Sequence, residues 1–554
     1  MDKDRLARPE HRWMARYPPG VDWHSDIPPR PVYALLDDAA ARFAARPFLD
    51  FLGKRYSYGD AARLVEKAAL GLRRLGVGKG VKVGLFLPNC PYGVICYFAV
   101  LKVGGTVVNY NPLSAERELV HQIEDSATEI MVTLDVAPLY GKLAAALAGT
   151  RLRRVIVCHM SGILPLAKGI LYRVTQWRQR ASPPRDERHL WFEDLIANDG
   201  AYAPVAVTPR SDIAVLQYTG GTTGDPKGVM LSHQNIYANT CQIRTWFTRA
   251  EPGRERLLAI LPFSHCFGMT AVMNFAVSLG GELVIFPRFD LKEVLRAMER
   301  KRVTMLIGVP TLFHAINECP DISRYDLSSL KICVSGGDSL PRSVQEKFVA
   351  LTGCPLAEGY GLTEAAPVAT CSNPLEGIDR PGSCGLPLPQ TTIEIVSTEG
   401  TALAPGDIGE ICIAGPQVML GYWQKPEATR ECLADGRLRT GDIGRMDEDG
   451  FLYFVDRLKD VISVRGYKVY PRIVEEAIRL HPAVGEVAVV GVPDAARGHI
   501  AKAFVVLRPG AALTDEGLCA FLGDKLSRVE IPHAIEFRTG LPKSAAGKIL
   551  KREL

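Results

Sequence analysis

Residues 218–228, YTGGTTGDPKG, place four glycines, three threonines and a lysine within one short stretch. Glycine adopts backbone conformations closed to other residues, so successive N–H groups can turn toward one anion. The threonine hydroxyls add donors and the lysine adds positive charge. The stretch therefore predicts an anion-binding loop of the kind that holds phosphate. The residues expected to contact the anion are Thr219, Gly220, Gly221, Thr222, Thr223, Gly224 and Lys227.

The residues on either side predict a strand before the loop and a helix after it. Residues 213–219 form a short apolar, β-branched run, and Ser232 can cap a helix that follows. Strand, loop and helix in succession is the setting that such an anion loop requires. The loop is not a Walker A sequence, because Lys227 stands between Pro226 and Gly228. A flexible surface loop is the alternative, but it leaves this composition without a physical use.

Length and composition indicate a soluble globular protein with more than one domain. The chain has 554 residues, which is more than one hydrophobic core usually supports. Apolar residues make up 47% and charged residues 23% of the chain, as in folded rather than disordered proteins. The net charge is 66 minus 61, or +5, which is too mild to indicate a nucleic-acid-binding protein.

The sequence predicts a cytoplasmic location. The N-terminal residues, MDKDRLARPEHRW, are charged and lack the apolar core of a secretory signal. Residues 83–108 form the longest apolar tract, but prolines, Lys102 and a Gly104-Gly105 pair interrupt it, which favours strands and a helix over a membrane span. The 13 cysteines form no CxxC pair, a pattern typical of reduced thiols.

Apolar runs alternate with amphipathic helices on both sides of the glycine-rich loop. This alternation predicts an α/β protein whose large N-terminal domain has two doubly wound subdomains with parallel sheets. From about residue 382 short strands lie between glycines and prolines, which predicts a small β subdomain. The residues after 456 suffice for an independent α+β domain. The expected organisation is a large domain at 1–456, a charged connection at 457–460 and a C-terminal domain at 461–554.

Residues 160–180, MSGILPLAKGILYRVTQWRQR, depart from this rhythm. A basic amphipathic helix of this kind can lie on an anionic bilayer. The alternative is a helix packed on the protein with an ordinary solvated face, and both interpretations stay open. The apolar residues that share one helical face are Ile163, Leu166, Ile170, Val174 and Trp177. The positive charges, with no acidic residue among them, are Lys168, Arg173, Arg178 and Arg180.

Several other stretches bring chemically useful side chains to the ends of predicted strands. In residues 358–364, EGYGLTE, Tyr360 can stack on a purine, Thr363 can donate to a phosphate and Glu364 is a hard oxygen ligand suited to Mg²⁺. Asp442, in LRTGDIG, can accept hydrogen bonds from two ribose hydroxyls, and Arg457 can add a second contact. Together these residues predict a nucleotide site.

Two isolated residues allow more than one interpretation. His265, in LPFSHCFGM, is either a structural hydrogen-bonding residue or part of a substrate site, and its surroundings lack the second ligand that a metal would need. Lys548 follows a glycine in LPKSAAGKILKREL. It is either a mobile positive charge that reaches an anion or part of a solvated basic tail.

In this order, the stretches resemble the signature motifs of the adenylate-forming superfamily of acyl-CoA synthetases, luciferases and peptide-synthetase adenylation domains. The resemblance covers essentially the whole chain and is closest to bacterial long-chain fatty acyl-CoA synthetases, including the insertion at 160–180. It implies an AMP-binding (adenylation) domain followed by a C-terminal domain that swivels about Lys459. One departure is Ile473, where many relatives carry glutamate, which bears only on local packing.

The resemblance also implies roles for individual residues. Lys548 would be the adenylation lysine, His265 would line the acyl pocket and Gly466 would lie in a loop that faces CoA. Glu364 would hold Mg²⁺, and Asp442 with Arg457 would contact the ribose. The implied catalytic residues are Lys548, Thr363, Glu364, Lys227 and His265. The implied nucleotide contacts, besides the glycine-rich loop, are Gly336, Gly337, Asp338, Glu358, Gly359 and Tyr360.

The stretch GGDSL also matches a phosphopantetheine attachment site with Ser339 as acceptor. It follows a predicted strand inside an α/β alternation, however, and not a helical carrier module. The expected activity is therefore that of an ATP-dependent acyl-CoA ligase, which uses Mg²⁺ and coenzyme A and acts on a long- or medium-chain fatty acid. The alternatives are an enzyme that loads a carrier protein or forms an amide, and a membrane-associated fatty-acid uptake protein. Chain length and oligomeric state, including a homodimer, stay open.

Overall fold

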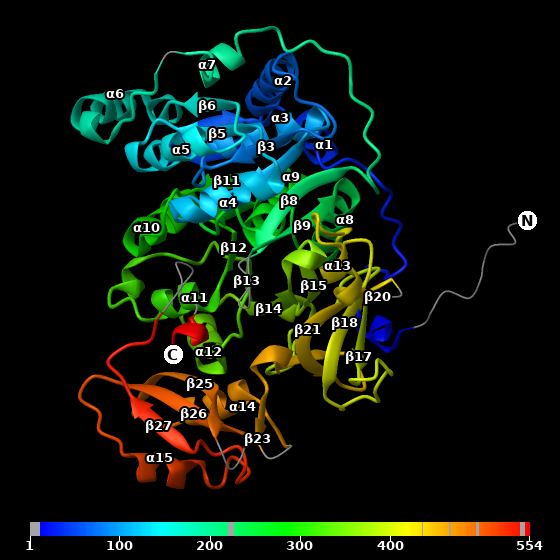
Figure 1. Cartoon of the computed structure of the whole chain (residues 1–554), viewed down its shortest axis with the longest axis vertical. Coiled ribbons are helices and arrows are strands. Elements are labelled where there is room, and N and C mark those ends of the chain that lie inside the picture. The colour runs from blue at the N-terminus through cyan, green and yellow to red at the C-terminus, as the bar shows by residue number, and fades with distance from the viewer. Residues whose placement is uncertain are drawn as a thin grey trace, which may run out of the picture. The chain divides into compact units, whose positions relative to one another are not determined.

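The computed structural model describes residues 11–184, 186–219, 226–434, 436–464, 467–494, 498–542 and 549–554. The chain forms two compact units. Unit 1 comprises Met1–Thr392 and Ile413–Leu438, and unit 2 comprises Ile393–Cys412 and Arg439–Leu554. Figure 1 traces the chain through both units with its elements labelled.

Unit 1 contains two large sheets whose central strands are parallel, as the alternating pattern predicts. The eight-stranded sheet runs in the order β19 (Gly421–Tyr422), β9 (Lys227–Ser232), β8 (Ile213–Thr219), β4 (Thr106–Asn109), β3 (Lys82–Leu85), β5 (Ile130–Leu134), β6 (Arg154–Cys158), β7 (His189–Trp191). The nine-stranded sheet runs β16 (Leu386–Pro387), β15 (Val368–Cys371), β14 (Leu356–Gly361), β13 (Ile332–Gly336), β12 (Met305–Gly308), β10 (Arg256–Ala259), β11 (Glu282–Ile285), β1 (Pro47–Phe51), β2 (Lys54–Ser57). The two predicted α/β subdomains are confirmed.

The sheets do not divide the chain into an early and a late half. Strand β1 pairs in parallel with β11, so the early β1–β2 hairpin extends the later sheet. Strand β9 pairs with β8, so the residues after the glycine-rich loop complete the earlier sheet. Because each sheet includes strands from the other stretch of the chain, the two α/β layers of unit 1 are joined by main-chain crossings.

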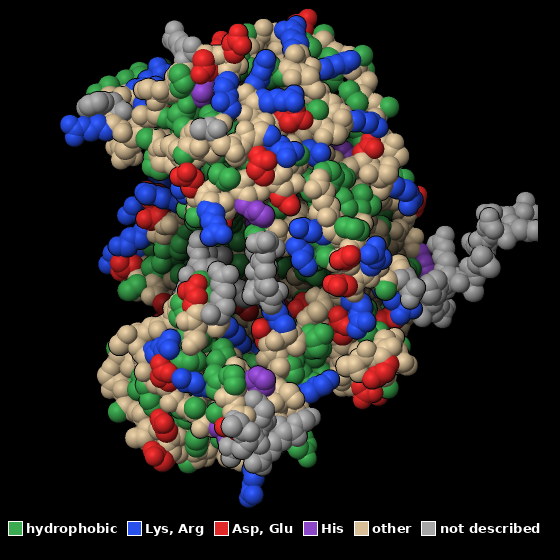
Figure 2. Space-filling model, in the orientation of Figure 1, with side chains coloured by type: hydrophobic (Ala, Val, Ile, Leu, Met, Phe, Trp, Pro, Cys, Tyr) green, Lys and Arg blue, Asp and Glu red, His purple; other side chains and the backbone are tan. Residues whose placement is uncertain are grey.

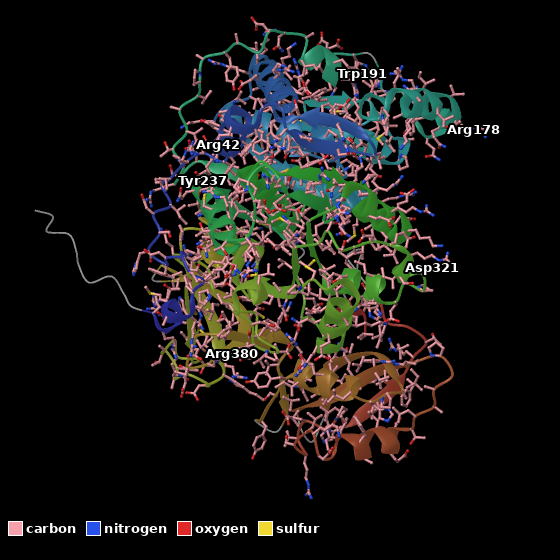
Figure 3. The ribbon with its side chains drawn as sticks, turned by 180° about the vertical axis from the view of Figure 1, so that it is seen from behind. Arg42, Arg178, Trp191, Tyr237, Asp321 and Arg380 are labelled. Atoms are coloured by element: carbon pink, nitrogen blue, oxygen red, sulfur yellow. The ribbon has the colours of Figure 1, made fainter. Side chains whose placement is uncertain are left out.

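Helices cover the sheets of unit 1, and two of them are buried on nearly every side. In α3 (Pro91–Lys102) and α8 (His233–Trp246), residues at almost all positions are buried, which is typical of helices enclosed between layers. Figure 3 shows the same layers from behind. The other helices of unit 1 are α1 (Ala34–Phe43), α2 (Tyr58–Arg74), α4 (Glu116–Ser126), α5 (Ala137–Gly149), α6 (Leu166–Thr175), α7 (Phe192–Leu195), α9 (Phe275–Leu279), α10 (Leu291–Lys301), α11 (Pro310–Asn317), α12 (Arg342–Thr352) and α13 (Pro426–Cys432).

Helix α6 and its neighbours differ from the predicted helix at 160–180. Ile163 lies in a separate 3₁₀ turn, η2 (Met160–Ile163), and is buried, so it does not belong to the exposed apolar face. Leu166, Ile170 and Val174 expose 82%, 56% and 69% of their surface, and Leu171 joins them at 60%. Figure 2 shows hydrophobic side chains gathered beside basic ones over this part of unit 1. Within residues 160–180, only α6 (Leu166–Thr175) is an α-helix, and its apolar side faces solvent.

Unit 2 contains a β subdomain and the C-terminal α+β segment. The first sheet runs β17 (Thr392–Val396), β18 (Gly409–Ala414), β21 (Arg437–Met446), with β22 (Leu452–Arg457) also on β21. Its edge strand, the short β20 (Leu433–Ala434), belongs to the chain segment of unit 1. The second runs β24 (Tyr467–Val469), β23 (Ile462–Val464), β26 (Gly498–Leu507), β25 (Val484–Asp494), with β27 (Ala534–Phe537) on β26. Helices α14 (Pro471–Arg479) and α15 (Asp515–Leu522) contribute Val474, Ile478 and Leu518 to its core.

Candidate active site

The glycine-rich loop joins two antiparallel strands. Thr219, the last residue of β8, lies opposite Lys227, the first residue of β9. The predicted strand before the loop and the predicted helix that Ser232 caps are both confirmed, but strand β9, which the sequence did not predict, lies between the loop and that helix. Helix α8 begins only at His233, where Ser232 caps it as predicted by accepting the Asn235 N–H at 3.1 Å. Six strand residues, about 20 Å at the usual rise, separate that helix end from the loop, so its dipole cannot serve an anion there.

Five predicted loop residues lie outside the part of the chain that the structure describes. These are Gly220, Gly221, Thr222, Thr223 and Gly224. The structure describes both ends of the loop, however, and the Thr219 hydroxyl donates to the Lys227 carbonyl at 3.5 Å. Lys227 is exposed at the start of β9, so its ammonium remains accessible to an anion.

Lys227 and Glu364 both contact one tyrosine, Tyr422. The Lys227 Nζ is 5.1 Å from the centre of the Tyr422 ring, and the Tyr422 hydroxyl donates to Glu364 Oε1 at 2.8 Å. Burial first, and then the Glu364 charge, raise the pKa of Tyr422, so this hydroxyl stays protonated and donates. The predicted phosphate lysine and the predicted metal carboxylate thus meet through a residue that the motifs did not include.

The element that brings Tyr422 to this place is the short strand β19. Tyr422 pairs with Val229 on β9, and the next N–H, that of Trp423, donates to the Gly228 carbonyl at 2.7 Å. The Glu364 turn, η6 (Thr363–Ala365), is held to the same segment because the Met419 N–H donates to the Glu364 carbonyl at 2.8 Å. Residues far apart in the sequence therefore form one site within unit 1.

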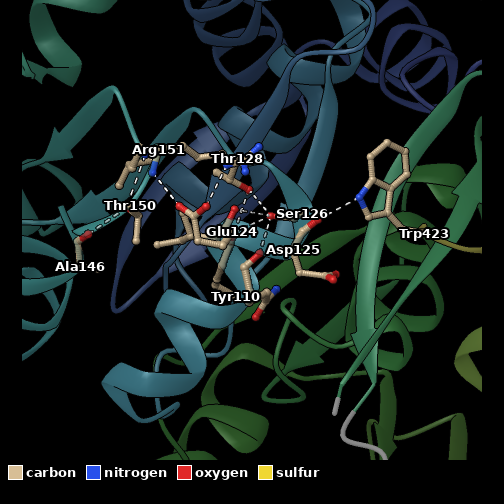
Figure 4. A network of polar contacts seen from close by, with 12 residues as sticks. Tyr110, Glu124, Asp125, Ser126, Thr128, Ala146, Thr150, Arg151 and Trp423 are labelled. Atoms are coloured by element: carbon tan, nitrogen blue, oxygen red, sulfur yellow. Dashed lines mark hydrogen bonds and ion pairs between the residues drawn. The ribbon is translucent and has the colours of Figure 1, made fainter. Parts of the chain in front are cut away.

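Asp125, at the end of α4, anchors both the loop strand and the β19 segment. Its carboxylate accepts the Tyr218 hydroxyl at 2.5 Å, and its carbonyl accepts the Trp423 indole N–H at 3.0 Å. Behind it, Ser126 and Thr128 bond each other at 2.7 Å and both contact Tyr110 (Figure 4). Burial first, and then the bonded carboxylate, raise the pKa of Tyr218. This polar network fixes the entrance to the glycine-rich loop.

The other predicted nucleotide contacts lie at the ends of two neighbouring parallel strands, β13 and β14. Gly336 on β13 stands in register with Gly359 on β14, and a Cβ at Gly336 would come 3.3 Å from the Gly359 carbonyl. Gly337 then turns the chain with a φ of +81°, which favours glycine. The Glu358 carboxylate accepts the Leu340 N–H at 3.1 Å, so it ties this turn to β14. Of the remaining predicted contacts, Asp338 is exposed, whereas Tyr360 and Thr363 are buried.

His265 lies in the turn between β10 and the following helix, which is a π-helix at Phe267–Asn274. Its Nδ1 accepts the Phe267 N–H at 3.2 Å, and surrounding protein atoms lower the pKa of the ring below its usual value. The ring is nevertheless exposed to solvent. The lowered pKa keeps the imidazole neutral near pH 7, and the residue is accessible from solvent.

Two buried amides hold the His265 turn, and the motif analysis missed both. Gln217 on β8 donates to the Ser264 carbonyl at 2.8 Å. Asn89 donates to the Leu261 carbonyl at 2.9 Å and accepts the Phe263 N–H at 2.7 Å. The signal for both was a polar amide within an apolar run, IAVLQYT for Gln217 and LFLPNC for Asn89.

The predicted ribose contacts lie side by side in unit 2. Asp442 on β21 pairs with Arg457 on β22, and the Arg457 Nε is 3.7 Å from the Asp442 carboxylate. Lys459 lies in the 3₁₀ turn that follows, η8 (Leu458–Asp460). Gly466 and Lys548 lie outside the described residues.

Asp456, which the motif analysis did not single out, binds both ends of the stretch that contains the predicted hinge. Its carboxylate accepts the Arg457 N–H and the Arg472 N–H, each at 2.8 Å. Burial raises its pKa above the usual value. The Asp456 carboxylate therefore links the backbone on both sides of residues 457–460, and a large backbone change in that stretch would strain these two hydrogen bonds.

The donor set of unit 1 fits a hydrated Mg²⁺ that is shared with phosphate. Within the described ranges, no three His, Cys, Asp or Glu side chains gather in a way that could enclose a metal. Mg²⁺ commonly binds through one or two carboxylates together with substrate phosphates and water. Glu364 beside the lysine of an anion loop meets that requirement without a protein cage.

Sequence comparison assigns the chain to a family. A family model described as AMP-binding enzyme matches residues 36–423, and a second, AMP-binding enzyme C-terminal domain, matches residues 473–548. The chain belongs to the AMP-binding enzyme family. Among AMP-binding enzymes, a long-chain-fatty-acid–CoA ligase of Bacillus subtilis is 43% identical over 98% of this chain and 97% of its own. One of Escherichia coli O157:H7 is 39% identical over the same shares.

Solved structures place the fold among the same enzymes. The ATP-bound MatB of Rhodopseudomonas palustris matches with a TM-score of 0.83 and 27% identity over 95% of this chain and 98% of its own. The anthranilate CoA ligase AuaEII, in complex with anthranoyl-AMP, matches with a TM-score of 0.82 and 26% identity over 96% and 98%. The α/β class predicted from the alternating pattern is thereby confirmed for this AMP-binding enzyme.

Proposed function

We infer that the protein is an ATP-dependent, AMP-forming acid–thiol ligase that converts long-chain fatty acids into their CoA thioesters. The observation that supports this most is the meeting of Lys227 and Glu364 at Tyr422, on a chain that matches long-chain-fatty-acid–CoA ligases over nearly its whole length. The enzyme uses ATP, Mg²⁺ and CoA. It acts on a carboxylic acid, and a fatty acid follows from the relatives.

In the first half-reaction the acid carboxylate attacks the α-phosphate of ATP and pyrophosphate leaves. Two anions must approach each other, so catalysis consists mainly of positioning and of neutralising charge. Lys227 neutralises phosphate charge at the loop, and Thr363 donates to the phosphate. Glu364 would hold Mg²⁺, which would supply positive charge to the phosphates. His265 stays neutral and lines the pocket for the fatty acid. Lys548 neutralises the remaining negative charge where the carboxylate attacks the α-phosphate.

In the second half-reaction the CoA thiol attacks the acyl-adenylate carbonyl and AMP leaves. Asp442 and Arg457 hold the ribose throughout both steps. A rotation of the C-terminal domain about Lys459 withdraws Lys548 and brings the Gly466 loop to the thiol. The two half-reactions therefore depend on different residues of the C-terminal segment.

The activity is tested with ATP–pyrophosphate exchange and thioester formation across a panel of acids. Dodecanoate and longer acids should support both reactions, and benzoate or a cinnamate should be poorer. Exchange without thioester formation would favour a carrier-loading or amide-forming enzyme. The absence of exchange with every acid would favour a fatty-acid uptake protein and contradict the ligase.

Two lysines test the proposed rotation. Lys548→Ala should lose about 10²–10³ in acid-dependent exchange, because one preorganised charge is removed from the first transition state. Supplied with synthetic acyl-adenylate and CoA, the same variant should still form thioester. Lys459→Pro, which restricts the backbone at the hinge, should show the reverse. Equal loss of both reactions in Lys548→Ala, or parental thioester formation in Lys459→Pro, would contradict a rotating domain.

A peripheral membrane contact through α6 is the proposed partner surface. Asp135, fully buried, accepts the Met160 N–H at 2.7 Å and pairs with His159 at 2.9 Å, so the base of the 160–180 segment is fixed. Leu166 and Val174 are exposed on α6. Residues 160–180 carry positive charges and no acidic residue, so this surface complements an anionic bilayer. Arg178 lies at the outer edge of unit 1 (Figure 3). Within the described residues no helix is long and apolar enough to cross a membrane.

Vesicle sedimentation tests this contact. Leu166→Ser with Val174→Ser should reduce binding to vesicles that contain phosphatidylglycerol, most clearly at low salt, where surface attraction is least screened. Leu480→Ser is the matched control, since Leu480 in unit 2 is also 67% exposed. Equal binding of the double variant and the parent would contradict the proposal.

A further inference from the structure

We propose that Tyr422 is a positioning residue for the nucleotide: its hydroxyl orients the metal-binding carboxylate of Glu364, and its ring holds the Lys227 ammonium apart from that carboxylate. The inference rests on the proposed function, in which Glu364 serves the cation and Lys227 the phosphates. It adds a residue that none of the predicted motifs contains.

The backbone of Tyr422 is fixed on both sides. On one side it pairs with β9, whose first residue is Lys227. On the other side its N–H donates to Thr429 Oγ1 on α13 at 2.9 Å. The preceding residue, Gly421, has a φ of +139°, and a Cβ there would come 2.6 Å from the Thr429 side chain. Both the conformation and the space require glycine, so the position of Tyr422 is closely determined.

The side chain of Tyr422 reaches its two partners with different groups. Its hydroxyl donates to Glu364 Oε1 at 2.8 Å, a hydrogen bond to a charged acceptor. The second carboxylate oxygen, Oε2, can then face a cation. The ring centre lies 5.1 Å from Lys227 Nζ, within the range of a cation–π contact.

The Tyr422 side chain also bears on how the Lys227 and Glu364 charges interact with each other. A lysine and a glutamate that contact the same side chain can form a direct ion pair, which would occupy both groups. In the part of the chain that the structure describes, Lys227 and Glu364 make no such pair, and the Tyr422 side chain contacts each of them instead. Both charges thus stay available, one for phosphate and one for a cation.

Two substitutions separate the two contacts. Tyr422→Phe keeps the ring and removes the hydroxyl, whereas Tyr422→Leu removes both. Tyr422→Phe should weaken calorimetric binding of Mg²⁺-ATP about 10-fold, the effect of one hydrogen bond to a charged group, and leave binding of metal-free ATP unchanged. Tyr422→Leu should in addition weaken metal-free ATP about threefold, because Lys227 loses its aromatic contact.

Tyr453→Phe is the matched control. Tyr453 also has a cation over its ring, Arg445 at 4.1 Å, and a hydroxyl that donates to a carboxylate, Asp447 at 3.2 Å. None of these residues is a predicted site residue, so both ATP affinities should stay at the parental values. Thermal unfolding of each variant reports whether it is folded.

The ATP-binding measurements test the role of Tyr422, whereas the exchange assay tests the proposed function. Parental Mg²⁺-ATP affinity in Tyr422→Phe, or an equal loss with and without the metal, would overturn the role of the hydroxyl. Equal metal-free ATP affinity in Tyr422→Leu and Tyr422→Phe would overturn the role of the ring. Failure of the parent enzyme to catalyse acid-dependent exchange would instead overturn the proposed function, and the ATP-binding measurements would still decide the role of Tyr422.

Discussion

The two groups of predicted site residues, here called the long-range half (unit 1) and the local half (unit 2), are built in different ways. In unit 1, Lys227, Glu364 and Tyr422 come from three segments far apart in the chain, and Tyr422 and Glu364 alone are separated by 58 residues. In unit 2, Asp442 and Arg457 face each other within one β hairpin. The first half depends on the pairing of β19 with β9 and on buried polar residues such as Asp125. The second depends on local strand register alone, so distant substitutions should affect the two halves unequally.

The largest expected effect is on the long-range half. Glu364→Gln keeps the shape of the side chain and removes its charge, so the rate of acid-dependent ATP–pyrophosphate exchange should fall about 10²–10³-fold. Rapid-quench measurement of adenylate formation checks this directly. ATP affinity in the absence of Mg²⁺ should stay near the parental value. A fall of less than threefold in the rate would remove Glu364 from the reacting phosphates.

A substitution in the local half should weaken ATP binding more than it slows the chemical steps. Asp442→Ala removes a carboxylate whose hydrogen bonds to ribose are each worth about 1.5–3 kcal/mol, so the Kd for ATP should rise about 10- to 100-fold. The thioester step from pre-made acyl-adenylate should change less than the overall reaction. Calorimetry with ATP is the measurement, and an unchanged Kd would remove Asp442 from the ribose site.

Lowering the pH should reduce the free energy of unfolding of unit 1, which contains the long-range half. His233 begins α8 directly after β9, is buried and accepts the Val32 N–H at its Nδ1, and burial lowers its pKa from 6.5 to about 4. Between those values the unfolded chain binds a proton that the folded chain does not. Stability therefore falls as the pH drops from 6.5 toward 4, by about 2 kcal/mol at pH 5 for this group.

The test compares urea unfolding of unit 1, followed by tryptophan fluorescence, at pH 8 and pH 5. His233→Gln should lose about 2 kcal/mol less than the parent between the two pH values. Asp456 in unit 2 has the opposite sign, because its pKa is raised and the folded state holds the proton more tightly. The same pH dependence in His233→Gln and in the parent would assign the acid sensitivity to other groups.

The smallest expected effect is on the turn that presents His265. Gln217→Leu preserves volume but leaves the Ser264 carbonyl without its donor, which costs about 1 kcal/mol. We expect the KM for the fatty acid to rise about fivefold, with the Kd for ATP unchanged. A loss of ATP affinity as large as the change in KM would show that Gln217 supports the loop strand and not the acid side.

Much of this molecule followed from patterns in the sequence. Alternating apolar runs predicted two α/β subdomains, because strands buried on both faces have to be nearly all apolar. The Ser232 cap was predictable, since a hydroxyl before a helix satisfies an otherwise unpaired N–H. Asp442 and Arg457 were both predicted as ribose contacts, and the structure pairs them across β21 and β22.

Other features depended on which strands meet. The sequence predicted the helix after Ser232 but not the strand before it. Residues 227–232 pair with β8, and Val229 and Leu231 are buried in the eight-stranded sheet. The exposed apolar face of α6 also differs from the face predicted for one continuous helix at 160–180. Ile163 lies in a separate turn and packs inward, whereas Leu171 faces solvent.

The sequence by itself predicted the chemistry that the chain can supply: a lysine at an anion loop, a carboxylate suited to Mg²⁺ and a pair of ribose contacts, each within a short motif. Only the tertiary structure decided that Tyr422 joins the first two of these. Motifs record residues that are neighbours along the chain, whereas the Tyr422 contacts arise from strand pairing between β19 and β9. Such pairing depends on the burial of whole sheets, and no short stretch of sequence contains that information.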